Sequence, residues 1–600
     1  MSLGRCASSF FRHPIKLSGT VMREPTRPLP PLVPLSHGGW EVNSFMSSAD
    51  YTIRGLGLVP PNKIVPVIVV PGIMGTNLRA KQKPRLGRVE DERNKMVKPG
   101  QPTWRPPNGE LEGFNASRVW DRYTPQQRQL LLDPATLEVD PTGPVIIPDA
   151  EDGYVLTERE LRERGWGEVY ADSYGGLLYG LQTRLNQTFG FDEQGKKRFV
   201  KQHWKDVMAC DPQRWGLRQF ASLTEDHLVK HAQHYFPVYA FGYCWLHDCK
   251  SSAELLEKRI LEIIDSWKKA KRQCSKVILV THSMGGLVAR ACAKRIPDKI
   301  AGVIHGVMPA LGAPVAYRRI ASGTESSTPN NLPLKKFEGS RTAMILGSST
   351  SKTTPVLATS PGALELLPNH LYPQPWLHVR VIRFVGGVQG TNHTGKTGVS
   401  GYQTKPYDAL SFPNANLQNP YDLYRDMKSW FRLINPDLAD PAGKYSQTEK
   451  GVRQVIRAAI GAAESFHKIL DDYYHPNTYA FYGDDRSQLS YGQVRWVAIQ
   501  QAGSTTALTP ANLTAGQYIG ETDTGQRRVL VDGKNELRFA PDQQDARGDG
   551  TVPHQSGAGP AGKVKQVFAT EGYDHQESYN NEHMLMLTLR LLTKIVQEIS

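Results

Sequence analysis

The stretch Ser275-Lys-Val-Ile-Leu-Val-Thr-His-Ser-Met-Gly-Gly-Leu-Val-Ala-Arg-Ala-Cys-Ala-Lys-Arg-Ile-Pro297 decides the fold of this chain. Its first part is a short apolar, β-branched run, which is typical of a strand buried on both faces. Its last part has the composition of a helix, and Pro297 stops that helix. Ser283 stands directly between the two, on what must be a sharp turn. A serine in this position predicts a nucleophile raised above the edge of a sheet.

The segments on either side repeat the alternation of strands and helices. Residues 63–70 and 237–242 are apolar and predict strands, and residues 253–272 carry apolar residues at helical spacing. Residues 301–308 and 377–385 predict two more strands, while residues 477–483 and 494–500 are weaker candidates. Strands that alternate with helices form a parallel sheet with both faces covered. We therefore predict an α/β-hydrolase fold with a mostly parallel central sheet, helices on both faces and large lid or cap insertions.

The chain of 600 residues is longer than such a core requires. Residues 1–60 are rich in proline and polar residues and predict an N-terminal extension, followed by the core with its insertions over 61–600. A cap or loop region is expected at about 80–170, a first lid at about 318–370, a helical second lid at about 388–475 and a β-rich excursion at about 485–545. Long excursions of this kind are uncommon unless they have a function, and lids are one such function.

Composition excludes several classes of protein. Hydrophobic residues make up 39% and charged residues 22%, as in ordinary globular proteins. No apolar run is long enough to cross a bilayer, and the N-terminus lacks the apolar stretch of a secretory signal, so we expect synthesis in the cytoplasm. Six cysteines without CxxC pairing indicate neither a disulfide framework nor a zinc site. We expect no cofactor and no metal.

The net charge of +14 would suit nucleic acid or an anionic membrane surface, or serve solubility alone. No zinc finger, RNA-binding signature or long basic run concentrates the charge, so we expect no nucleic-acid partner.

The turn at Ser283 has most of the features of a nucleophile elbow. Small residues are needed two positions before and after the serine, and Thr281 and Gly285 stand there, although Thr281 departs from the stricter glycine. In this elbow the N–H of the next residue, Met284, faces the oxyanion, and a second donor comes from the loop after an earlier strand. Ile73, in Val70-Pro-Gly-Ile-Met-Gly-Thr-Asn-Leu78, is the predicted second donor. An ordinary strand-exit turn is the alternative for that loop.

In this fold the acid and then the histidine follow the nucleophile along the chain. Asp549 lies between two glycines in Arg547-Gly-Asp-Gly-Thr-Val-Pro553 and is the predicted acid, with Asp545 in reserve; an ordinary Asp-Gly turn is the alternative. His575 and His583 are both candidates for the base. A final helix that begins near residue 578 leaves His575 free, whereas one that begins near residue 581 favours His583. We select His575.

Four segments resemble the lecithin:cholesterol acyltransferase and lysosomal phospholipase A2 family: residues 70–78, residues 282–286, Ser360-Pro-Gly-Ala-Leu-Glu-Leu-Leu-Pro368 and residues 548–552. Together with residues 312–319, residues 475–483 and Gly572-Tyr-Asp-His-Gln-Glu-Ser-Tyr579, they are closer to bacterial proteins similar to the GPI inositol-deacylase group, among them type VI secretion lipase effectors. This likeness favours His575, although residues 581–587 look like the mammalian phospholipase motif.

The resemblance implies a phospholipase of the A1 or A2 type, delivered into the periplasm of a competitor and neutralised at home by an immunity protein. It also implies a component of the secretion apparatus as a partner. An acyltransferase or a general carboxylesterase would use the same residues. A binding protein on an inactive hydrolase fold is the alternative of another class, and the presence of serine, aspartate and histidine argues against it.

Overall fold

The computed structural model describes residues 61–82, 88–105, 109–147, 156–191, 198–325, 343–391, 397–446, 451–500, 508–522 and 525–599. Within the predicted N-terminal extension, 1–60, it describes four short strands, and the rest of that segment lies outside the described residues. These strands are β1 (Arg27–Pro28), β2 (Val33–Pro34), β3 (Trp40–Glu41) and β4 (Gly55–Leu56).

A six-stranded sheet forms the centre of the molecule, and all of its neighbouring strands are parallel. The residues around the predicted nucleophile supply one of its two middle strands, β14. Each strand ends at the same edge of the sheet, so the loops that follow the strands gather there. In spatial order the strands are β13 (Val238–Ala240), β6 (Val67–Val70), β14 (Val277–His282), β15 (Ile300–Gly306), β18 (Thr478–Gly483) and β25 (Gln566–Thr570).

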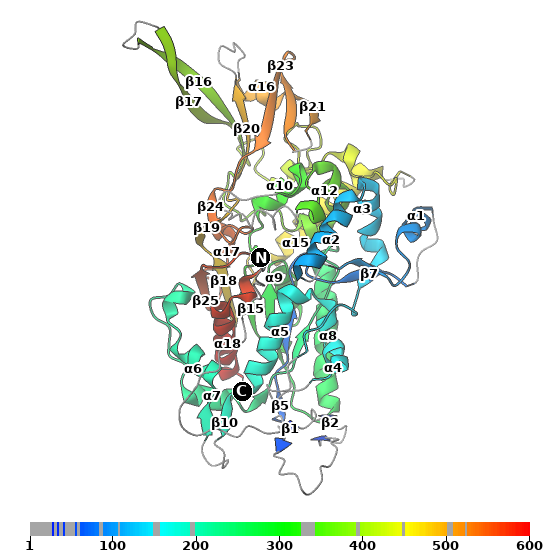
Figure 1. Ribbon diagram of the computed structural model, residues 1–600, viewed down its shortest axis with the longest axis vertical. Helices are drawn as coiled ribbons and strands as arrows, with labels where there is room; N and C mark the ends of the chain where they lie inside the picture. Colours follow the sequence, from blue (N-terminus) through cyan, green and yellow to red (C-terminus); the bar gives the residue numbers. More distant parts are fainter. Residues whose placement is uncertain are drawn as a thin grey trace, which may run out of the picture.

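Helices cover both faces of this sheet, as the alternation of elements predicts (Figure 1). Val67 and Val69 of β6 pack in one core cluster with α5 (Ala171–Asn186) and α18 (Glu582–Gln597). Ile68 and Val70 point to the opposite face and pack with α8 (Cys249–Lys269) and α9 (Gly285–Arg295). The uninterrupted apolar run of β6 is thereby explained, because both of its faces are buried.

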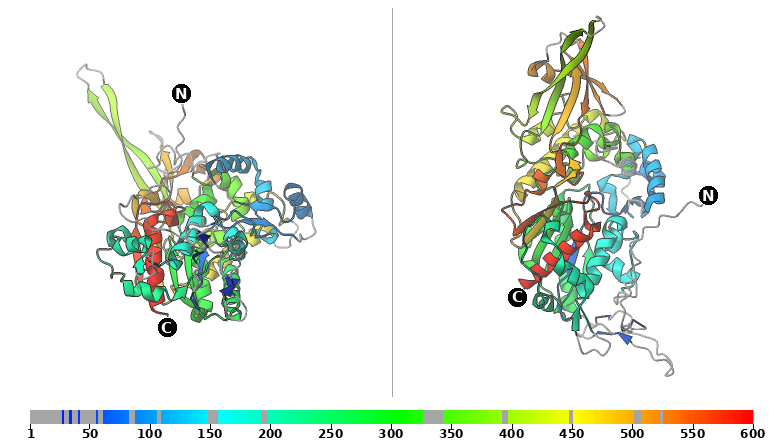
Figure 2. Two further views of the ribbon diagram at one scale, coloured as in Figure 1. Left: turned by 60° about the horizontal axis from the view of Figure 1, so that its bottom comes forward. Right: turned by 60° about the vertical axis from the view of Figure 1, so that its left-hand side comes forward.

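A second six-stranded sheet lies at one end of the long axis of the molecule, at the top of Figure 1. Its long hairpin, β16 and β17, projects away from the body in Figure 1 and in the left view of Figure 2. The order is β17 (Thr397–Phe412), β16 (Leu377–Thr391), β20 (Val494–Gln500), β23 (Asn535–Pro541), β22 (Arg527–Val531) and β21 (Gln517–Glu521).

This second sheet corrects two expectations. The strand predicted at 377–385 for the central sheet is β16, which pairs with β17 and β20 instead. Residues 478–483, a weaker candidate, supply the fifth strand of the central sheet. The excursion predicted to be helical at 388–475 also contains a long strand, β17, besides the expected helix α15 (Gly451–Leu470).

The remaining elements lie around the central sheet, apart from α16, which contacts β17 of the second sheet. Before β14 they are β5 (Lys63–Ile64), β7 (Leu78–Ala80), α1 (Arg88–Met96), β8 (Pro102–Trp104), α2 (Gly109–Arg122), α3 (Pro125–Leu131), β9 (Leu137–Val139), α4 (Glu158–Glu163), β10 (Phe189–Phe191), β11 (Arg198–Val200), α6 (Gln202–Ala209), α7 (Glu225–His231) and β12 (His234–Tyr235). After β15 they are α10 (Pro314–Ser322), α12 (Thr350–Leu357), α13 (Pro361–Leu364), α14 (Pro420–Arg425), β19 (Asp485–Ser490), α16 (Pro510–Thr514), β24 (Ala546–Gly548) and α17 (His554–Gly557).

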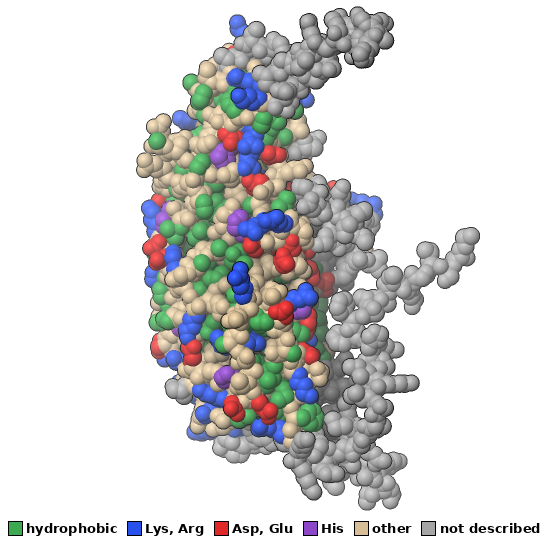
Figure 3. Space-filling model, turned by 90° about the vertical axis from the view of Figure 1, so that its left-hand side faces the viewer, with side chains coloured by type: hydrophobic (Ala, Val, Ile, Leu, Met, Phe, Trp, Pro, Cys, Tyr) green, Lys and Arg blue, Asp and Glu red, His purple; other side chains and the backbone are tan. Residues whose placement is uncertain are grey.

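The positive charge of the chain is dispersed over the face drawn in Figure 3. Lys and Arg side chains are interspersed there with acidic side chains over the described residues. Of the helices that the structure describes, none is both long and apolar enough to span a bilayer.

Candidate active site

Ser283 lies on a strained turn between β14 and α9. Its φ angle is 52°, in the left-handed region that residues with a side chain rarely adopt. A Cβ atom on Gly285 would lie 2.4 Å from the carbonyl oxygen of Val70, so only glycine fits where the turn passes over β6. The N–H of Ser283 donates to the carbonyl of Gly306 at 2.9 Å, which ties the turn to β15. This is the geometry predicted for a nucleophile elbow.

A continuous hydrogen-bond chain joins the three predicted site residues. The Oγ of Ser283 lies 2.8 Å from Nε2 of His575, and Nδ1 of His575 lies 2.8 Å from Oδ2 of Asp549. Because a carboxylate only accepts, Nδ1 carries the proton and Nε2 is free to accept from the serine hydroxyl. Asp549 and Ser283 are buried, while the side chain of His575 is 13% exposed. The structure therefore brings together residues that lie up to 292 positions apart in the sequence.

The loop after β24 holds the carboxylate of Asp549 in place. Its Oδ1 accepts from the backbone N–H of Thr551 at 3.0 Å and of Val552 at 2.7 Å. Its carbonyl oxygen accepts from the N–H of His575 at 2.7 Å, so the acid and the histidine are joined through backbone as well as side chain. The other oxygen, Oδ2, is left for the imidazole.

The alternative acid and base have other contacts. Asp545 accepts from the N–H of Gly492 at 2.8 Å and pairs with Arg495 at 2.8 Å, so it braces a loop of the second sheet. His583 lies in the first turn of α18, and its carbonyl oxygen accepts from the indole N–H of Trp215. No hydrogen bond joins either of them to Ser283 among the described residues.

The argument from the start of the last helix was wrong, although His575, the residue that we selected, is the one in contact with Ser283. Helix α18 begins at Glu582 with Asn581 as its cap, the case expected to favour His583. His575 is nevertheless the histidine in contact with Ser283, because β25 ends at Thr570 and the following loop crosses the edge of the sheet before any helix begins.

The two predicted oxyanion donors flank the serine. Met284 follows Ser283 directly, at the start of α9, and Ile73 lies in the turn after β6. Within the described part of the chain, neither backbone N–H donates to another residue. Gly72 lies close by, since a Cβ atom there would come within 2.9 Å of the Cβ of Ser283. The turn continues through Met74, whose φ angle is 65° and whose carbonyl accepts from the indole of Trp104.

Sequence reasoning missed two residues of the site, Tyr174 of α5 and His282 of β14. Tyr174 Oη lies 2.9 Å from Nδ1 of His282 and accepts from the N–H of Gly72 at 2.9 Å. Nε2 of His282 lies 2.9 Å from the carbonyl oxygen of His575. Burial lowers the pKa of His282 to about 3. A histidine at the end of a fully buried strand was the available signal, because a polar group in that position needs partners.

Among the residues that the structure describes, no three His, Cys, Asp or Glu side chains gather in a way that could hold a metal ion. A serine hydroxyl on an imidazole, an imidazole on a carboxylate and two unpaired N–H groups beside the hydroxyl are instead the parts needed for acyl transfer.

Comparisons with known proteins agree with this geometry. The family model described as a PGAP1-like alpha/beta domain matches residues 246–331, a span that includes Ser283. A chain in the crystal structure of the Tle4–Tli4 complex has 28% sequence identity and a TM-score of 0.67, and the match covers 89% of this chain and 99% of that chain. Phospholipase PlaB from Legionella pneumophila has 9% identity and a TM-score of 0.12 over 56% of this chain and 85% of that chain, too low to indicate a common fold. No curated protein sequence matches the chain at a significant level.

The first two matches confirm the predicted α/β-hydrolase fold and the predicted resemblance to the GPI inositol-deacylase-like group. The chain is an enzyme of the lipase and esterase class.

Proposed function

We propose that the protein cleaves acyl esters of membrane phospholipids through Ser283, His575 and Asp549. The observation that carries the proposal is the hydrogen-bond chain from the serine hydroxyl to the imidazole and on to the carboxylate, with 2.8 Å at each step. Nucleophile, base and orienting acid stand in the order that a serine hydrolase requires.

The reaction begins at the serine. His575 Nε2 takes the proton of the Ser283 hydroxyl as the oxygen attacks the ester carbonyl, and Asp549 stabilises the imidazolium that forms. The imidazolium then gives its proton to the departing alcohol, here a lysophospholipid, and the acyl group stays on the serine. A water molecule, deprotonated by His575, attacks the acyl-enzyme and releases the fatty acid.

The N–H groups of Ile73 and Met284 are proposed to bind the negatively charged oxygen of each tetrahedral intermediate. Each such donor contributes about 3 to 4 kcal/mol to stabilisation of the transition state in enzymes of this kind. Their lack of partners among the described residues supports the assignment, because an N–H group that has no acceptor is available to the substrate, as at Met284 where α9 begins.

Apolar surface next to the serine supports a lipid as the substrate. The turn of Ile73 and Met74 is only partly buried and packs at the margin of the core cluster on the α8 and α9 face. Partly buried residues of the cap and the predicted first lid pack against the same core cluster: Tyr123, Ile345, Leu346, Leu357 and Leu366. Arg128 of α3 donates to the carbonyl oxygens of Met344 and Ile345, so cap and lid are joined in this structure. We propose that the segments predicted as lids move to admit a lipid acyl chain.

The biological setting proposed here is that of a type VI secretion effector. The chain resembles such lipase effectors in its motifs, and the similar solved chain belongs to a complex of two proteins. We propose an immunity protein as the partner in the producing cell, a component of the secretion apparatus as the carrier and the periplasm or membrane of the target cell as the place of action.

An acyltransferase or a general carboxylesterase would share every step up to the acyl-enzyme. The acceptor alone differs, water in one case and an alcohol in the other. A binding protein without activity is disfavoured. The strained backbone at Ser283 costs free energy, and a turn with only a structural role would have no reason to keep that strain.

The decisive experiment measures fatty acid released from phospholipid vesicles whose sn-1 and sn-2 chains differ in mass. Wild-type protein is compared with Ser283→Ala, which retains the turn but lacks the nucleophile. Release by the wild type alone supports the proposal, and the identity of the released chain separates A1 from A2 activity. Equal release by both proteins, or none by either, contradicts it.

A further inference from the structure

We propose that Tyr174 and His282 are positioning residues that join the oxyanion loop to the loop of the catalytic base. The inference rests on the proposed function and adds to it. Its basis is a line of three hydrogen bonds, each 2.9 Å long, from the N–H of Gly72 through Tyr174 and His282 to the carbonyl of His575.

Only one arrangement of protons satisfies this line. The carbonyl of His575 can only accept, so Nε2 of His282 carries a hydrogen and donates it. Nδ1 of the neutral ring is then an acceptor, and the Tyr174 hydroxyl donates to it. The hydroxyl oxygen in turn accepts from the N–H of Gly72. Each hydrogen bond in the line has one possible donor and one possible acceptor, so the line has a direction and fixes the tautomer of His282.

The surroundings keep this ring neutral. His282 and Tyr174 are buried, and the pKa of His282 is lowered to about 3, first by burial and then by the nearby His575. Asp549 acts in the opposite direction on the pKa of His282, and its effect is smaller. The line therefore stays intact throughout the pH range in which His575 must act as a base.

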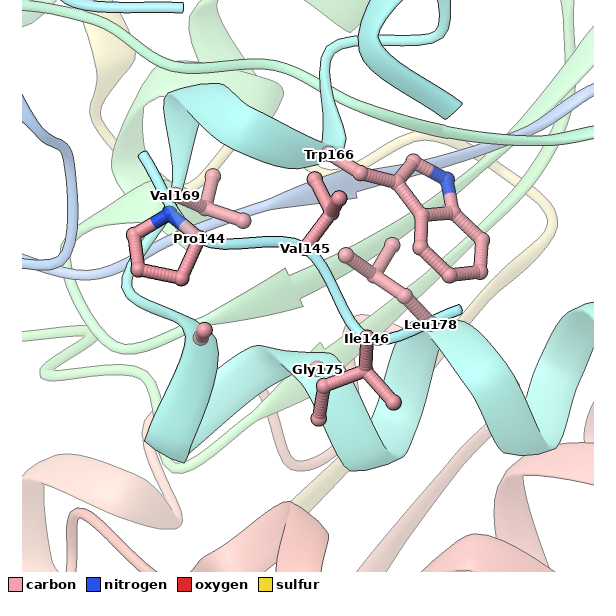
Figure 4. A pocket seen from close by; sticks show the side chains of 8 residues that line it. Pro144, Val145, Ile146, Trp166, Val169, Gly175 and Leu178 are labelled. Atoms are coloured by element: carbon pink, nitrogen blue, oxygen red, sulfur yellow. The ribbon is translucent and has the colours of Figure 1, made fainter. Parts of the chain in front are cut away.

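Tyr174 lies on α5, a helix that is packed against its surroundings. A Cβ atom on Gly175 would lie 2.4 Å from Cδ1 of Ile146, so this side chain lies on the first turns of the helix, while Leu177, Leu178 and Leu181 of the helix are buried in the core. Figure 4 shows Ile146 above Gly175, with Trp166 and Leu178 beside them. The helix cannot shift without disturbing this packing.

The same end of α5 also contacts the loop that follows His575. Gln576 Nε2 donates to the hydroxyl of Ser173, and Asn580 donates to the carbonyl of Asp172 at 3.1 Å. Asp172 and Ser173 of α5 therefore contact the histidine loop directly, and the next residue, Tyr174, contacts the oxyanion loop directly and the histidine loop through His282.

This arrangement explains how two loops that belong to different strands keep one geometry. Gly72 precedes Ile73, whose N–H is the proposed oxyanion donor, so the position of Tyr174 sets the position of that donor. The carbonyl of His575 is held by His282, which adjoins Ser283 in sequence. Transition-state stabilisation by preorganised donors falls steeply when such groups move, so loss of the line should lower kcat more than it changes KM.

The test compares Tyr174→Phe with a matched control, Tyr421→Phe. Tyr421 makes the same kind of contact in another part of the molecule: its hydroxyl lies 2.7 Å from Nδ1 of His467, whose Nε2 lies 2.8 Å from the carbonyl of Glu365. Each variant loses a buried tyrosine hydroxyl and its hydrogen bond to a neutral histidine, so the melting temperatures of the two variants should fall by similar amounts. Only Tyr174 is joined to the proposed catalytic residues.

Three quantities are measured on each purified full-length protein: kcat and KM for a soluble short-chain ester, the rate and end point of labelling of Ser283 by a fluorophosphonate, and the melting temperature. For Tyr174→Phe we expect kcat to fall ~10- to 100-fold with KM changed less than ~3-fold, and labelling to be slower yet complete. For Tyr421→Phe we expect kcat and the labelling rate to stay within ~2-fold of the wild type.

A kcat for Tyr174→Phe within ~3-fold of an active wild type would overturn the inference. So would a loss of kcat matched by an equal loss in the end point of labelling, since that indicates misfolded protein. Equal losses of kcat in the two tyrosine variants would overturn it as well. A wild type that neither hydrolyses esters nor reacts with the fluorophosphonate refutes the proposed function itself, which distinguishes the two failures.

Discussion

Glu365 should make the stability of this protein fall as pH rises through the neutral range. The residue follows α13, within the segment that resembles the phospholipase family. Its side chain is buried, its Oε2 accepts from the N–H of Cys249 at 2.8 Å and its Oε1 has no partner among the described residues. Burial raises the pKa of this carboxyl to about 8, against an ordinary value of 4.5.

The sign follows from proton binding. Between pH 4.5 and about 8 the folded protein keeps a proton on Glu365 that the unfolded chain has lost, so stability is lost as pH rises through this window. The full shift corresponds to roughly 5 kcal/mol. Cys249 begins α8, and a helix N-terminus favours the ionised carboxylate by up to ~2 kcal/mol, which leaves roughly 3 to 5 kcal/mol.

Glu365→Gln removes the titrating group and retains an acceptor for Cys249. For a chain of 600 residues that unfolds in one transition, 3 to 5 kcal/mol corresponds to roughly 2 to 4 °C in melting temperature. We therefore expect the melting temperature of the variant, relative to the wild type, to rise by this amount between pH 5 and pH 8.5. Differential scanning calorimetry at both pH values measures it.

Glu464→Gln is the matched control, because the pKa of Glu464 is shifted in the opposite direction from that of Glu365. Its side-chain contacts with Lys468 and Arg425 lower the pKa of Glu464 to about 2 despite partial desolvation, so this carboxylate is ionised across the whole window in both states. Its substitution should lower the melting temperature by the same amount at pH 5 and pH 8.5. A Glu365→Gln protein whose difference from the wild type does not change with pH would refute the reasoning.

Three further outcomes are expected. Gly285→Ala should prevent soluble expression or lower the melting temperature strongly, because its Cβ would meet the carbonyl oxygen of Val70 at 2.4 Å; a stable, active variant would contradict the elbow geometry. Asp549→Asn should lower kcat ~10⁴-fold, since an amide favours the wrong imidazole tautomer, while circular dichroism should show that the fold is retained. Retention of most activity would remove Asp549 from the proposed mechanism. Arg128→Met should destabilise the protein by roughly 2 to 3 kcal/mol in urea unfolding, because carbonyl oxygens of the helical turn at 343–346 lose their partner. An unchanged midpoint of urea unfolding would show that this contact contributes little.

The central sheet was predictable because burial on both faces leaves a plain mark in the sequence. Every residue of β14 and of β6 is buried. All four residues of β6 and the first four of β14 are apolar. The helix after Ser283 ended before Pro297 as expected, and the pairing of strands around it follows the rule for alternating elements.

The strand at 377–385 was assigned to the wrong sheet because its alternation was overlooked. Leu377, Val379 and Val381 are buried, whereas Arg380, between Val379 and Val381, is not. A period of two residues is typical of a sheet with one exposed face, as β16 has, and not of a strand inside a parallel core. The pattern was present in the sequence and favoured the second sheet.

The choice between His575 and His583 could not be made from helix limits, because the position of a loop residue depends on where the preceding strand ends. β25 ends at Thr570, at the same edge of the sheet as β14, and five residues then suffice to reach Ser283. Tyr174 and its contacts were beyond reach for a related reason: the hydroxyl acts across 108 residues of sequence, and no local spacing encodes that approach.

The order of the site residues along the chain has a consequence for biosynthesis. The base lies 292 residues after the serine, on the loop that follows the edge strand β25. At ~5 to 20 residues per second, a ribosome needs roughly 15 to 60 seconds to add that stretch. During this time the elbow exists without its imidazole, and a hydroxyl without a base is a poor nucleophile. On the proposed mechanism, nascent and prematurely terminated chains are inert toward the membranes of the cell that makes them, and activity begins only when the last strand closes the sheet.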